Sequence, residues 1–484
     1  MIIKTPSFGS ACAIFSFVIA VLGIGILHYE VAPQMPIVLS IIIVALYGLW
    51  LGIKWKELES SMIQGIVSGL PSILILCLIG MLIGVWILNG TVPTLSYYGL
   101  QILSPTYFLA SSVIICAVTS VVTGSSWSTI GTIGVALMAT AYGMGIPLAM
   151  AAGAIVSGAF FGDKMSPLSD TTNLAPAVAN VSIFDHIRHM LWTTVPSLVI
   201  TLGIFVVLGL QLERQTESFS QMTDLLTVLK NHFPITLWTL FSPLLILVLA
   251  TRRVSPIPTL VLGLIAAVLT TYATVPDINL GKIMTTAHFG YTSETGMADV
   301  DKLLSRGGLA NMMFAVSLII VALAFGGIIQ KTGIMDAILN GMKQYLTRKG
   351  NVILATVISC FGVNVLVGEQ YLSIVLPGKI IGPAYKKVNL HPVNLSRTLE
   401  DAGTLLHALI PWGVSGAFIM STLNIGMEYA VFAFLCFINP IIAIIYGYTG
   451  WCLKRLEEDQ SRIPPHPRKR KALDHDHENI SQAI

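Results

Sequence analysis

The chain consists of long apolar runs separated by short polar loops, a pattern that predicts a bundle of membrane-spanning α-helices. A helix crosses the hydrocarbon core of a bilayer with about 20 apolar residues. Runs close to this length occupy residues 8–27, 35–53, 63–88, 190–211, 234–251, 254–275, 309–330 and 428–450. The first run follows Lys4, but no small-residue cleavage site surrounds Ala32, so we interpret it as a helix and not as a signal peptide.

Two further regions are long enough to cross the membrane but are interrupted by polar residues and proline. Residues 146–181 contain Asp163 and Pro167, and residues 393–426 contain Asp401 followed by another proline. Because proline inside a helix removes a backbone hydrogen bond and clashes with the preceding turn, neither region can continue as a regular helix. The sequence therefore predicts two broken helices.

Two other regions, 106–143 and 351–385, are apolar on both sides of a polar centre that contains glycine. These centres read Thr123-Gly124-Ser125-Ser126 and Gly368-Glu369-Gln370, and we expect them to be the tips of re-entrant hairpins. Backbone that is not helical at membrane depth must be buried in protein or line a water-filled cavity. Since polar and charged residues gather at the same breaks, the interruptions indicate a transport function and not simple kinks.

The basic residues predict how the chain is threaded through the membrane. Loops rich in lysine and arginine face the cytoplasm, which places these residues there: Lys54, Lys56, Arg252, Arg253, Lys331, Lys343, Arg348, Lys349, Lys386, Lys387 and those of the C-terminal tail. One threading satisfies this rule, with ten crossings, two hairpins and both termini in the cytoplasm. The first hairpin then enters the membrane from outside and the second from inside.

This threading predicts two halves of opposite orientation. Each half contains three helices, a hairpin, a broken helix and a final helix. The halves are residues 1–212 and 234–450, joined by the polar loop 213–233 and followed by a basic tail at 451–484. Inverted repeats whose broken helices meet near the midplane are an architecture of secondary transporters.

Composition supports an all-α polytopic membrane protein in a lipid bilayer and excludes other classes. Hydrophobic residues make up 54% of the 484 residues and charged residues 11%, against about 25% charged in a soluble domain. The net charge is +3, and the one dense basic run is at 468–471, so we expect no nucleic-acid partner. The six cysteines show no CxxC spacing, which argues against a disulfide framework and a structural metal.

The first break carries an unusual density of oxygen ligands. Between Gly162 and Asn173 lie two carboxylates, Asp163 and Asp170, with further oxygens from Ser166, Ser169, Thr171, Thr172 and Asn173. A small hard cation prefers such oxygens. A carboxyl group removed from water can hold either a proton or a cation near neutral pH, and the two compete. We therefore predict a Na⁺ site here.

The neighbouring Lys164 affects which carboxylate exchanges ions. If Lys164 pairs with Asp163, that acid is structural, and Asp170 becomes the exchanging group. Asp170 has no basic residue within five positions. The sequence therefore favours Asp170 over Asp163.

The second break and the two tips add further candidates. A helix that starts at Pro392 rises about 15 Å in ten residues, which places Asp401 near the midplane, while Glu400 fits the midplane or the interface equally well. Thr404 follows on the same segment. The second tip offers Glu369 as an intramembrane acid or as a structural partner of Lys379, and the first tip offers hydroxyls at Ser125, Ser126, Ser128 and Thr129.

The stretch Gly-Asp-Lys-Met-Ser-Pro-Leu-Ser-Asp-Thr-Thr at 162–172 resembles the NhaC-type sodium/proton antiporter family, within the wider ion-transporter superfamily. Weaker support comes from residues 290–296, 304–308, 401–404 and 409–412. The resemblance implies a multi-pass protein of the bacterial plasma (inner) membrane that transports Na⁺ and protons without a cofactor. It also implies an elevator machine, in which paired hairpins and broken helices carry the substrate.

Other functions stay open at this point. The family resemblance extends to exchangers of malate and protons for lactate and sodium, and to amino-acid carriers. A small organic acid could bind at the half-helix N-termini and at the serines of the first tip. The Gly-Val-Ser-Gly stretch at 413–416, with His407, also resembles an intramembrane serine protease, while no HExxH or phosphate-binding loop is present. The sequence also leaves open whether the chain forms a homodimer.

Overall fold

The computed structural model describes residues 4–213, 219–297, 300–301 and 304–456. Within these residues the elements are helices, apart from one β-bridge between Leu390 and Arg455. Seven of the described helices are long and apolar enough to cross a membrane: Phe8–Ile26, Leu70–Leu88, Pro105–Thr123, Ile183–Leu212, Pro256–Thr274, Ala310–Thr332 and Lys349–Val367. The chain is therefore a polytopic helical membrane protein. The basic run at 468–471 and most of the predicted tail lie outside the described residues.

The helices of the first half follow the predicted runs and breaks. They are α1 (Phe8–Gly23), α2 (Gln34–Trp50), α3 (Trp55–Ser68), α4 (Leu70–Leu88), α5 (Thr91–Ile102), α6 (Phe108–Thr123), α7 (Ser126–Thr129), α8 (Val135–Gly143), α9 (Leu148–Met165), α10 (Asp170–Ala179) and α11 (Ile183–Glu213). A π-helical segment, Ile130–Gly134, connects α7 to α8.

The second half of the chain is preceded by a helix, Phe219–His232, inside the segment 213–233 that was predicted to be a connecting loop. The helices from this segment onward are α12 (Phe219–His232), α13 (Phe241–Thr251), α14 (Pro256–Thr274), α15 (Leu280–Phe289), α17 (Met313–Thr332), α18 (Ile334–Met342), α19 (Lys349–Val367), α20 (Gln370–Lys387), α21 (Pro392–Leu399), α22 (Leu405–His407), α23 (Val414–Leu423) and α24 (Phe434–Thr449). A π-helical segment, Glu400–Thr404, joins α21 to α22.

The run 63–88 was predicted as one crossing, and this prediction is wrong. Gly69 separates the amphipathic helix α3 from the apolar helix α4. Pro71 lies in the first turn of α4, where it has no amide hydrogen to continue the hydrogen bonding of α3. Gly69 also lies against Leu323 of α17, so that a larger side chain would collide with it.

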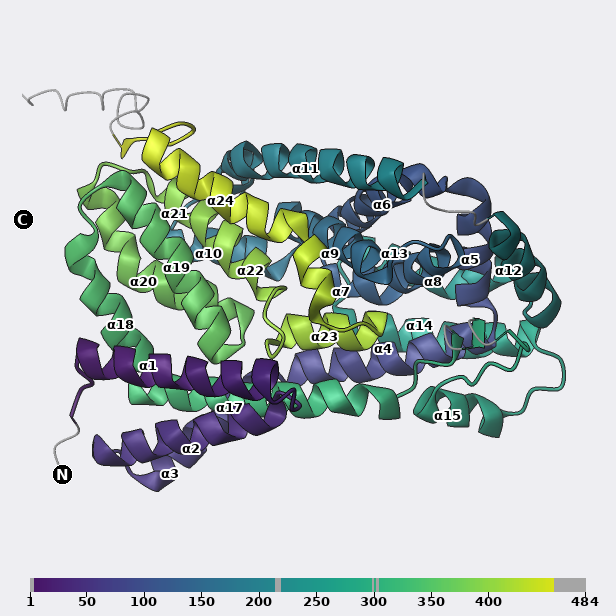
Figure 1. Ribbon diagram of the computed structural model, residues 1–484, viewed down its shortest axis with the longest axis horizontal. Coiled ribbons are helices and arrows are strands. Elements are labelled where there is room, and N and C mark those ends of the chain that lie inside the picture. The colour runs from purple at the N-terminus through teal and green to yellow at the C-terminus, as the bar shows by residue number, and fades with distance from the viewer. Residues whose placement is uncertain (1–3, 214–218, 298–299, 302–303, 457–484) are drawn as a thin grey trace, which may run out of the picture.

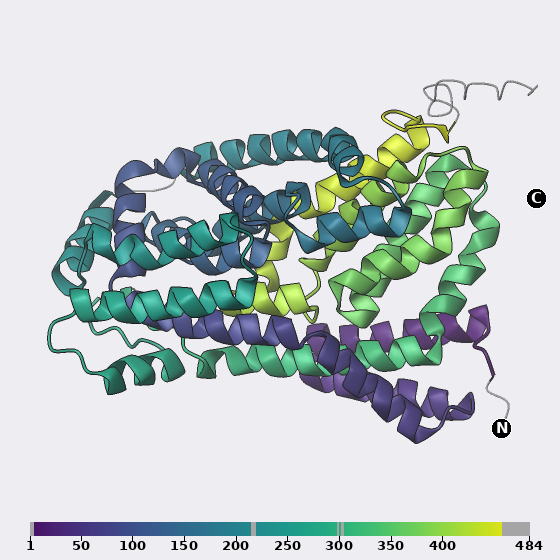
Figure 2. The same cartoon turned by 180° about the vertical axis from the view of Figure 1, so that it is seen from behind.

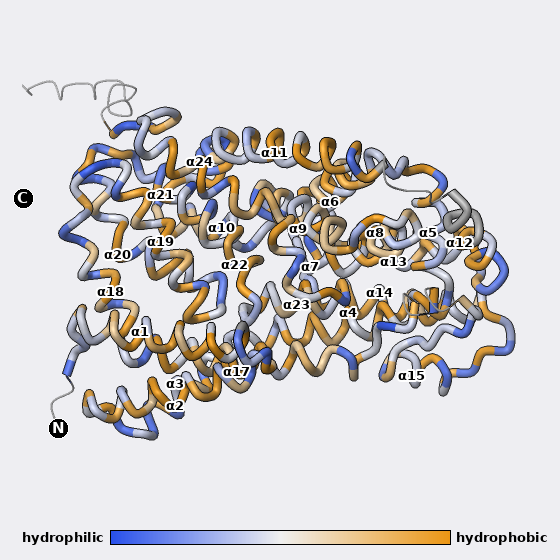
Figure 3. Tube along the Cα trace, viewed as in Figure 1, coloured by the Kyte–Doolittle hydropathy of each residue, from blue (hydrophilic) through white to orange (hydrophobic). Residues whose placement is uncertain are grey.

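Two groups of helices form the long sides of the molecule. Helices α1–α4, α14, α15 and α17 lie along one side, and α6, α11 and α24 lie along the other (Figures 1 and 2). Hydrophilic stretches gather toward the two ends of the long axis, while the helices between them are mainly apolar (Figure 3). Helix α2 exposes Met35, Leu39, Ile42, Leu46 and Trp50, which is the surface expected of a helix that faces lipid.

Both predicted helix breaks are present. The first separates α9 from α10 at residues 166–169, and the second separates α22 from α23 at residues 408–413. The two interrupted helices run in opposite directions along the long axis (Figure 1). This arrangement agrees with an inverted repeat, which stays a prediction.

The predicted hairpins are helix–turn–helix segments of different shape. Helices α19 and α20 meet at Gly368 and pack against each other. Helix α6 ends at Gly124 and packs mainly on α9, while the second arm of its hairpin, α8, packs on α5 and α9. The first and last described residues lie at the same end of the molecule (Figure 1), as expected for termini on one side of a membrane.

A labelling experiment tests the predicted orientation. Helices α5 and α18, which precede Ser104 and Lys349 in the chain, lie near opposite ends of the long axis (Figure 1). In a background in which the half-buried Cys12, Cys77 and Cys452 are replaced by serine, we expect Ser104→Cys to react with a membrane-impermeant maleimide in intact cells. Lys349→Cys should react only in inside-out vesicles. Labelling of Lys349→Cys in intact cells would contradict the threading.

Candidate cation and proton site

The two helix breaks and the two hairpin tips meet at one cavity of about 540 Å³. Its walls come from segments within residues 123–128, 163–173, 369–371 and 407–415. The remaining wall is formed by the α3–α4 junction and by the loop that contains Arg253. The structure thus brings together the four interruptions that the sequence predicted to carry function.

The two hairpin tips have the same construction. Gly124 and Gly368 adopt left-handed backbone conformations, with φ of 68° and 66°. The next residue then caps the following helix: the Ser125 hydroxyl accepts a hydrogen bond from Ser128 N at 3.2 Å, and the Glu369 carboxylate accepts one from Leu372 N at 2.8 Å. Glu369 therefore acts as a helix cap and does not pair with Lys379, which is exposed.

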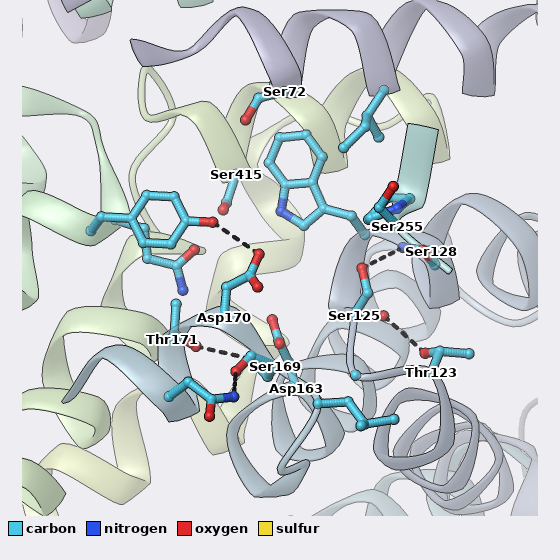
Figure 4. Close-up of a pocket in the computed structure, with 18 of the residues that line it drawn as sticks. Ser72, Thr123, Ser125, Ser128, Asp163, Ser169, Asp170, Thr171, Ser255 and Ser415 are labelled. Carbon is cyan, nitrogen blue, oxygen red and sulfur yellow. Dashed lines mark hydrogen bonds between the residues drawn. The ribbon is translucent and has the colours of Figure 1, made fainter. Parts of the chain in front are cut away.

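Asp163 lies near the end of α9 and is buried against the first tip. Its Oδ2 atom accepts a hydrogen bond from the Ser126 hydroxyl at 2.6 Å, and the Ser169 hydroxyl lies beside the same carboxyl group. Asp163 also lines the cavity. Figure 4 shows it facing the same space as Asp170. The site therefore offers a small cation a buried carboxylate with hydroxyl oxygens around it.

Asp170, the acid favoured by the sequence, is more exposed. It is the first residue of α10, and its Oδ2 atom lies 3.4 Å from the Tyr371 hydroxyl, which donates to it across the cavity (Figure 4). The preference for Asp170 depended on Lys164 pairing with Asp163. The structure pairs Lys164 elsewhere, so this reason no longer applies.

Lys164 belongs to a separate, fully buried ionic cluster. Its Nζ atom forms an ion pair with Asp401 and donates to Asn439 Oδ1 at 2.9 Å. Thr193 donates to the same Asp401 oxygen at 3.0 Å, and Arg397 Nε lies 3.9 Å from the other. Neither Lys164 nor Asp401 lines the cavity. The structure thus separates Asp401 from the cavity that contains Asp163.

Most of the other predicted ligands hold the backbone of the breaks in place. Thr129 donates to Ser125 O at 3.0 Å and Ser166 donates to Val121 O at 2.8 Å. Thr172 donates to the carbonyls of Asp163 and Lys164, Asn173 donates to Ser169 O, and Thr404 donates to Glu400 Oε1. These hydrogen bonds hold the site in shape. Five of the predicted ligands line the cavity: Ser125, Ser128, Ser169, Thr171 and Asn173.

Hydrogen bonds fasten the second tip to the second break. His407 Nε2 lies 3.0 Å from Gly368 O, and Nδ1 lies 2.8 Å from the Ser415 hydroxyl. Val414 N also donates to Gly368 O at 3.0 Å. The contact between His407 and Ser415 is one that a serine protease would need, but here the same histidine anchors the tip of a hairpin.

Sequence analysis missed several residues of the site. Arg397 could have been found, because it lies four positions before Asp401, a spacing that places two residues on one helix face. Tyr371, Thr193 and Asn439 come from other elements. No local pattern in the sequence links these three residues to the breaks.

The two tip glycines should differ in their tolerance of substitution. A left-handed conformation costs a residue with a Cβ atom about 1–2 kcal/mol, and a Cβ on Gly124 would also lie 2.6 Å from Leu168 Cβ. Around Gly368 the nearest atoms are 3.6 Å away. We expect Gly124→Ala to lower the thermal unfolding midpoint in detergent more than Gly368→Ala does.

Gly203 provides the matched control, because it lies inside α11 with no atom within 4 Å of an added Cβ. Gly203→Ala should leave the midpoint unchanged or raise it, since alanine favours a helix over glycine by about 1 kcal/mol. An equal loss of stability in Gly124→Ala and Gly368→Ala would argue against the close contact at Leu168.

The buried cluster should be more sensitive to loss of its acid than to loss of its lysine. Lys164→Met leaves Asp401 with Arg397, whereas Asp401→Asn leaves two buried cations without their shared acid. Removing one partner of a buried pair costs about 3–5 kcal/mol. We expect Asp401→Asn to lower the unfolding midpoint further than Lys164→Met does. The reverse order would show that Arg397 does not interact with Asp401.

Comparisons with known proteins identify the family of the chain. A model of the Na⁺/H⁺ antiporter family matches residues 158–451. The Na⁺/H⁺ antiporter NhaC of Alkalihalophilus pseudofirmus is 45% identical over 448 residues, which is 92% of this chain and 96% of that protein. NhaC of Bacillus subtilis is 41% identical over 92% of this chain and 98% of that protein.

The chain is also similar to a relative that is named for the exchange of organic acids. The malate-2H⁺/Na⁺-lactate antiporter of Bacillus subtilis is 38% identical over 90% of this chain and 94% of that protein. Among solved structures, MtrF of Neisseria gonorrhoeae matches with a TM-score of 0.36 and 13% identity over 82% of this chain and 84% of that chain. A TM-score this low does not establish a shared fold. The chain belongs to the Na⁺/H⁺ antiporter family.

Proposed function

We propose that this protein is a secondary transporter that exchanges Na⁺ for protons across the bacterial plasma membrane. The names of the two most similar relatives given above support this function. The observation that carries the proposal is the position of Asp163, a buried carboxylate at the junction of a helix break and a hairpin tip, with access to a cavity.

Competition at Asp163 couples the two ions. When the carboxyl group loses its proton, it becomes a cation ligand, with hydroxyl oxygens of Ser126 and Ser169 beside it. When it regains the proton, its negative charge is removed and the cation leaves. Because proton and cation cannot occupy the same carboxylate at once, net movement of one ion drives the other in the opposite direction.

We place the exchanging group at Asp163 in preference to Asp170. Asp163 is 8% exposed, so water competes little for its charge. Asp170 is exposed at the cavity wall beside Tyr371, where it can attract a cation toward the site. Glu369 lines the same cavity and adds a further carboxyl group.

Transport also needs the site to reach both sides of the membrane. We propose that the hairpins and broken helices move as one unit against α4, α14 and α17, in the manner of an elevator, with both termini in the cytoplasm. The hydrogen bonds from His407 and Val414 to Gly368 support movement as one unit, because they connect the second tip to the second break. An inverted repeat gives such a unit two similar end states.

A second candidate is exchange of a small organic acid together with these ions. The malate–lactate relative supports it, and so does Arg253, a cation in the cavity wall that suits a carboxylate. Transport of labelled malate or lactate by purified protein in liposomes distinguishes the two functions. Uptake that depends on a Na⁺ gradient would favour the organic acid, and Na⁺-driven proton movement without any acid would favour simple exchange.

Substitution of the two aspartates tests the proposed site. In liposomes, we expect Asp163→Asn to abolish Na⁺-driven proton movement, because the side chain keeps its shape but no longer titrates. Asp170→Asn should retain exchange with a weaker apparent affinity for Na⁺. In the wild type this affinity should increase as pH rises, until the carboxylate is fully ionised. Normal exchange in Asp163→Asn with none in Asp170→Asn would move the site to Asp170.

A further inference from the structure

A further acid, Glu400, lies behind the cavity and has no role in the exchange described above. It is fully buried in the π-helical segment between α21 and α22. Its Oε1 atom accepts a hydrogen bond from Thr404 at 2.8 Å, and its Oε2 atom has no hydrogen-bond partner among the described residues. A buried carboxyl oxygen without a partner is costly when the group is charged, so it requires an explanation.

Some groups around Glu400 favour its neutral form, and others favour its ionised form. Burial disfavours a charge on Glu400, and so does the acid Asp163 on α9. Lys164 on α9 favours the charged form. On the side of α19 the facing titratable group is Cys360. With Glu400 protonated, Lys164, Arg397 and Asp401 leave one net positive charge, and with Glu400 ionised the cluster is neutral. Charges of both signs thus surround a buried carboxyl group whose Oε2 atom has no hydrogen-bond partner among the described residues.

A chain of hydroxyl groups connects Glu400 to the cation site. Thr171 on α10 lies beside the Glu400 carboxyl group, and its Oγ1 atom is 3.2 Å from Ser169 Oγ. Ser169 in turn lies beside Asp163. Figure 4 shows Ser169 between Thr171 and Asp163 at the wall of the cavity. The chain therefore leads from the protein interior to the water-accessible site.

Hydroxyl groups can transmit a proton because each one both donates and accepts. Glu400 gives its proton to the Thr171 oxygen, and Thr171 passes its own hydroxyl proton to Ser169. Ser169 passes its hydroxyl proton to the Asp163 carboxylate or to water in the cavity. Both hydroxyl groups are restored, Glu400 becomes a carboxylate, and one proton has left the interior.

We infer that Glu400 is a proton-carrying group separate from the cation site at Asp163, and that Thr171 and Ser169 connect the two. The inference rests on the proposed Na⁺/H⁺ exchange. It predicts that the protein carries one proton on Asp163 and another on Glu400 for each Na⁺. Lys164 and Asp401 then form the charged surroundings in which Glu400 titrates, and they do not themselves bind the transported cation.

The proton count tests this inference directly. In liposomes with a clamped membrane potential, the Na⁺ gradient that just balances a fixed pH gradient gives the number of protons per Na⁺. We expect this number to fall from two in the wild type to one in Glu400→Gln. The potential should then no longer drive exchange, because charge movement across the membrane is lost.

The two proposals can fail separately. A wild type that moves no protons when Na⁺ is added contradicts the proposed function. A wild type that exchanges normally, with the same proton count and voltage dependence in Glu400→Gln, overturns the role of Glu400 and leaves the proposed function intact.

Substitution of threonines on the two sides of Glu400 tests the connection, even if Glu400→Gln does not fold. Thr171→Val removes the hydroxyl that leads to Asp163, and we expect it to slow exchange about a hundredfold or more, the scale typical of a lost proton-transfer group. Thr404→Val is the matched control, because it removes a hydroxyl beside the same carboxyl group but outside the chain. Equal losses in both variants, or a normal rate in Thr171→Val, would overturn the connection.

Discussion

The ion pair between Lys164 and Asp401 is the interaction on which the rest of the site depends. It joins the end of α9 to the π-helical segment after α21, and so it connects the two interrupted helices in a fully buried region. Two charges in such a place are stable only while they stay together. The pair therefore fixes how the two breaks lie relative to each other. Thr193 and Asn439 attach the same pair to α11 and α24.

This arrangement gives two consecutive residues different roles. Asp163 and Lys164 are consecutive, yet one lines the cavity and the other is enclosed in the ionic cluster. Because Lys164 has its own acid, Asp163 has no ion-pair partner among the described residues. A carboxylate without a fixed cation can accept a mobile one. The structural pair thus makes an exchangeable site possible one residue away.

The features that depend on local chemistry could be predicted from the sequence. Pro167 required a break, and the glycines at 124 and 368 marked the hairpin tips, because few other residues suit their backbone conformation. The partner of Lys164 could not be predicted, since Asp401 is 237 residues away. The break at Gly69 was also missed, because the apolar run continues through it and only Pro71 pointed to an interruption. The inverted repeat and the elevator movement stay predictions.

The placement of Asp163 and Lys164 on one helical turn also limits how this region can change during evolution. Successive residues of an α-helix point about 100° apart. The number of residues in α9 between Leu148 and Lys164 therefore sets the directions in which the side chains of Asp163 and Lys164 point. An insertion or deletion of one residue within that stretch would rotate both acid and base away from their partners at once. Point substitutions in α9 leave the rotation intact. Related sequences should therefore align through this helix without gaps, while length variation collects in the loop before it.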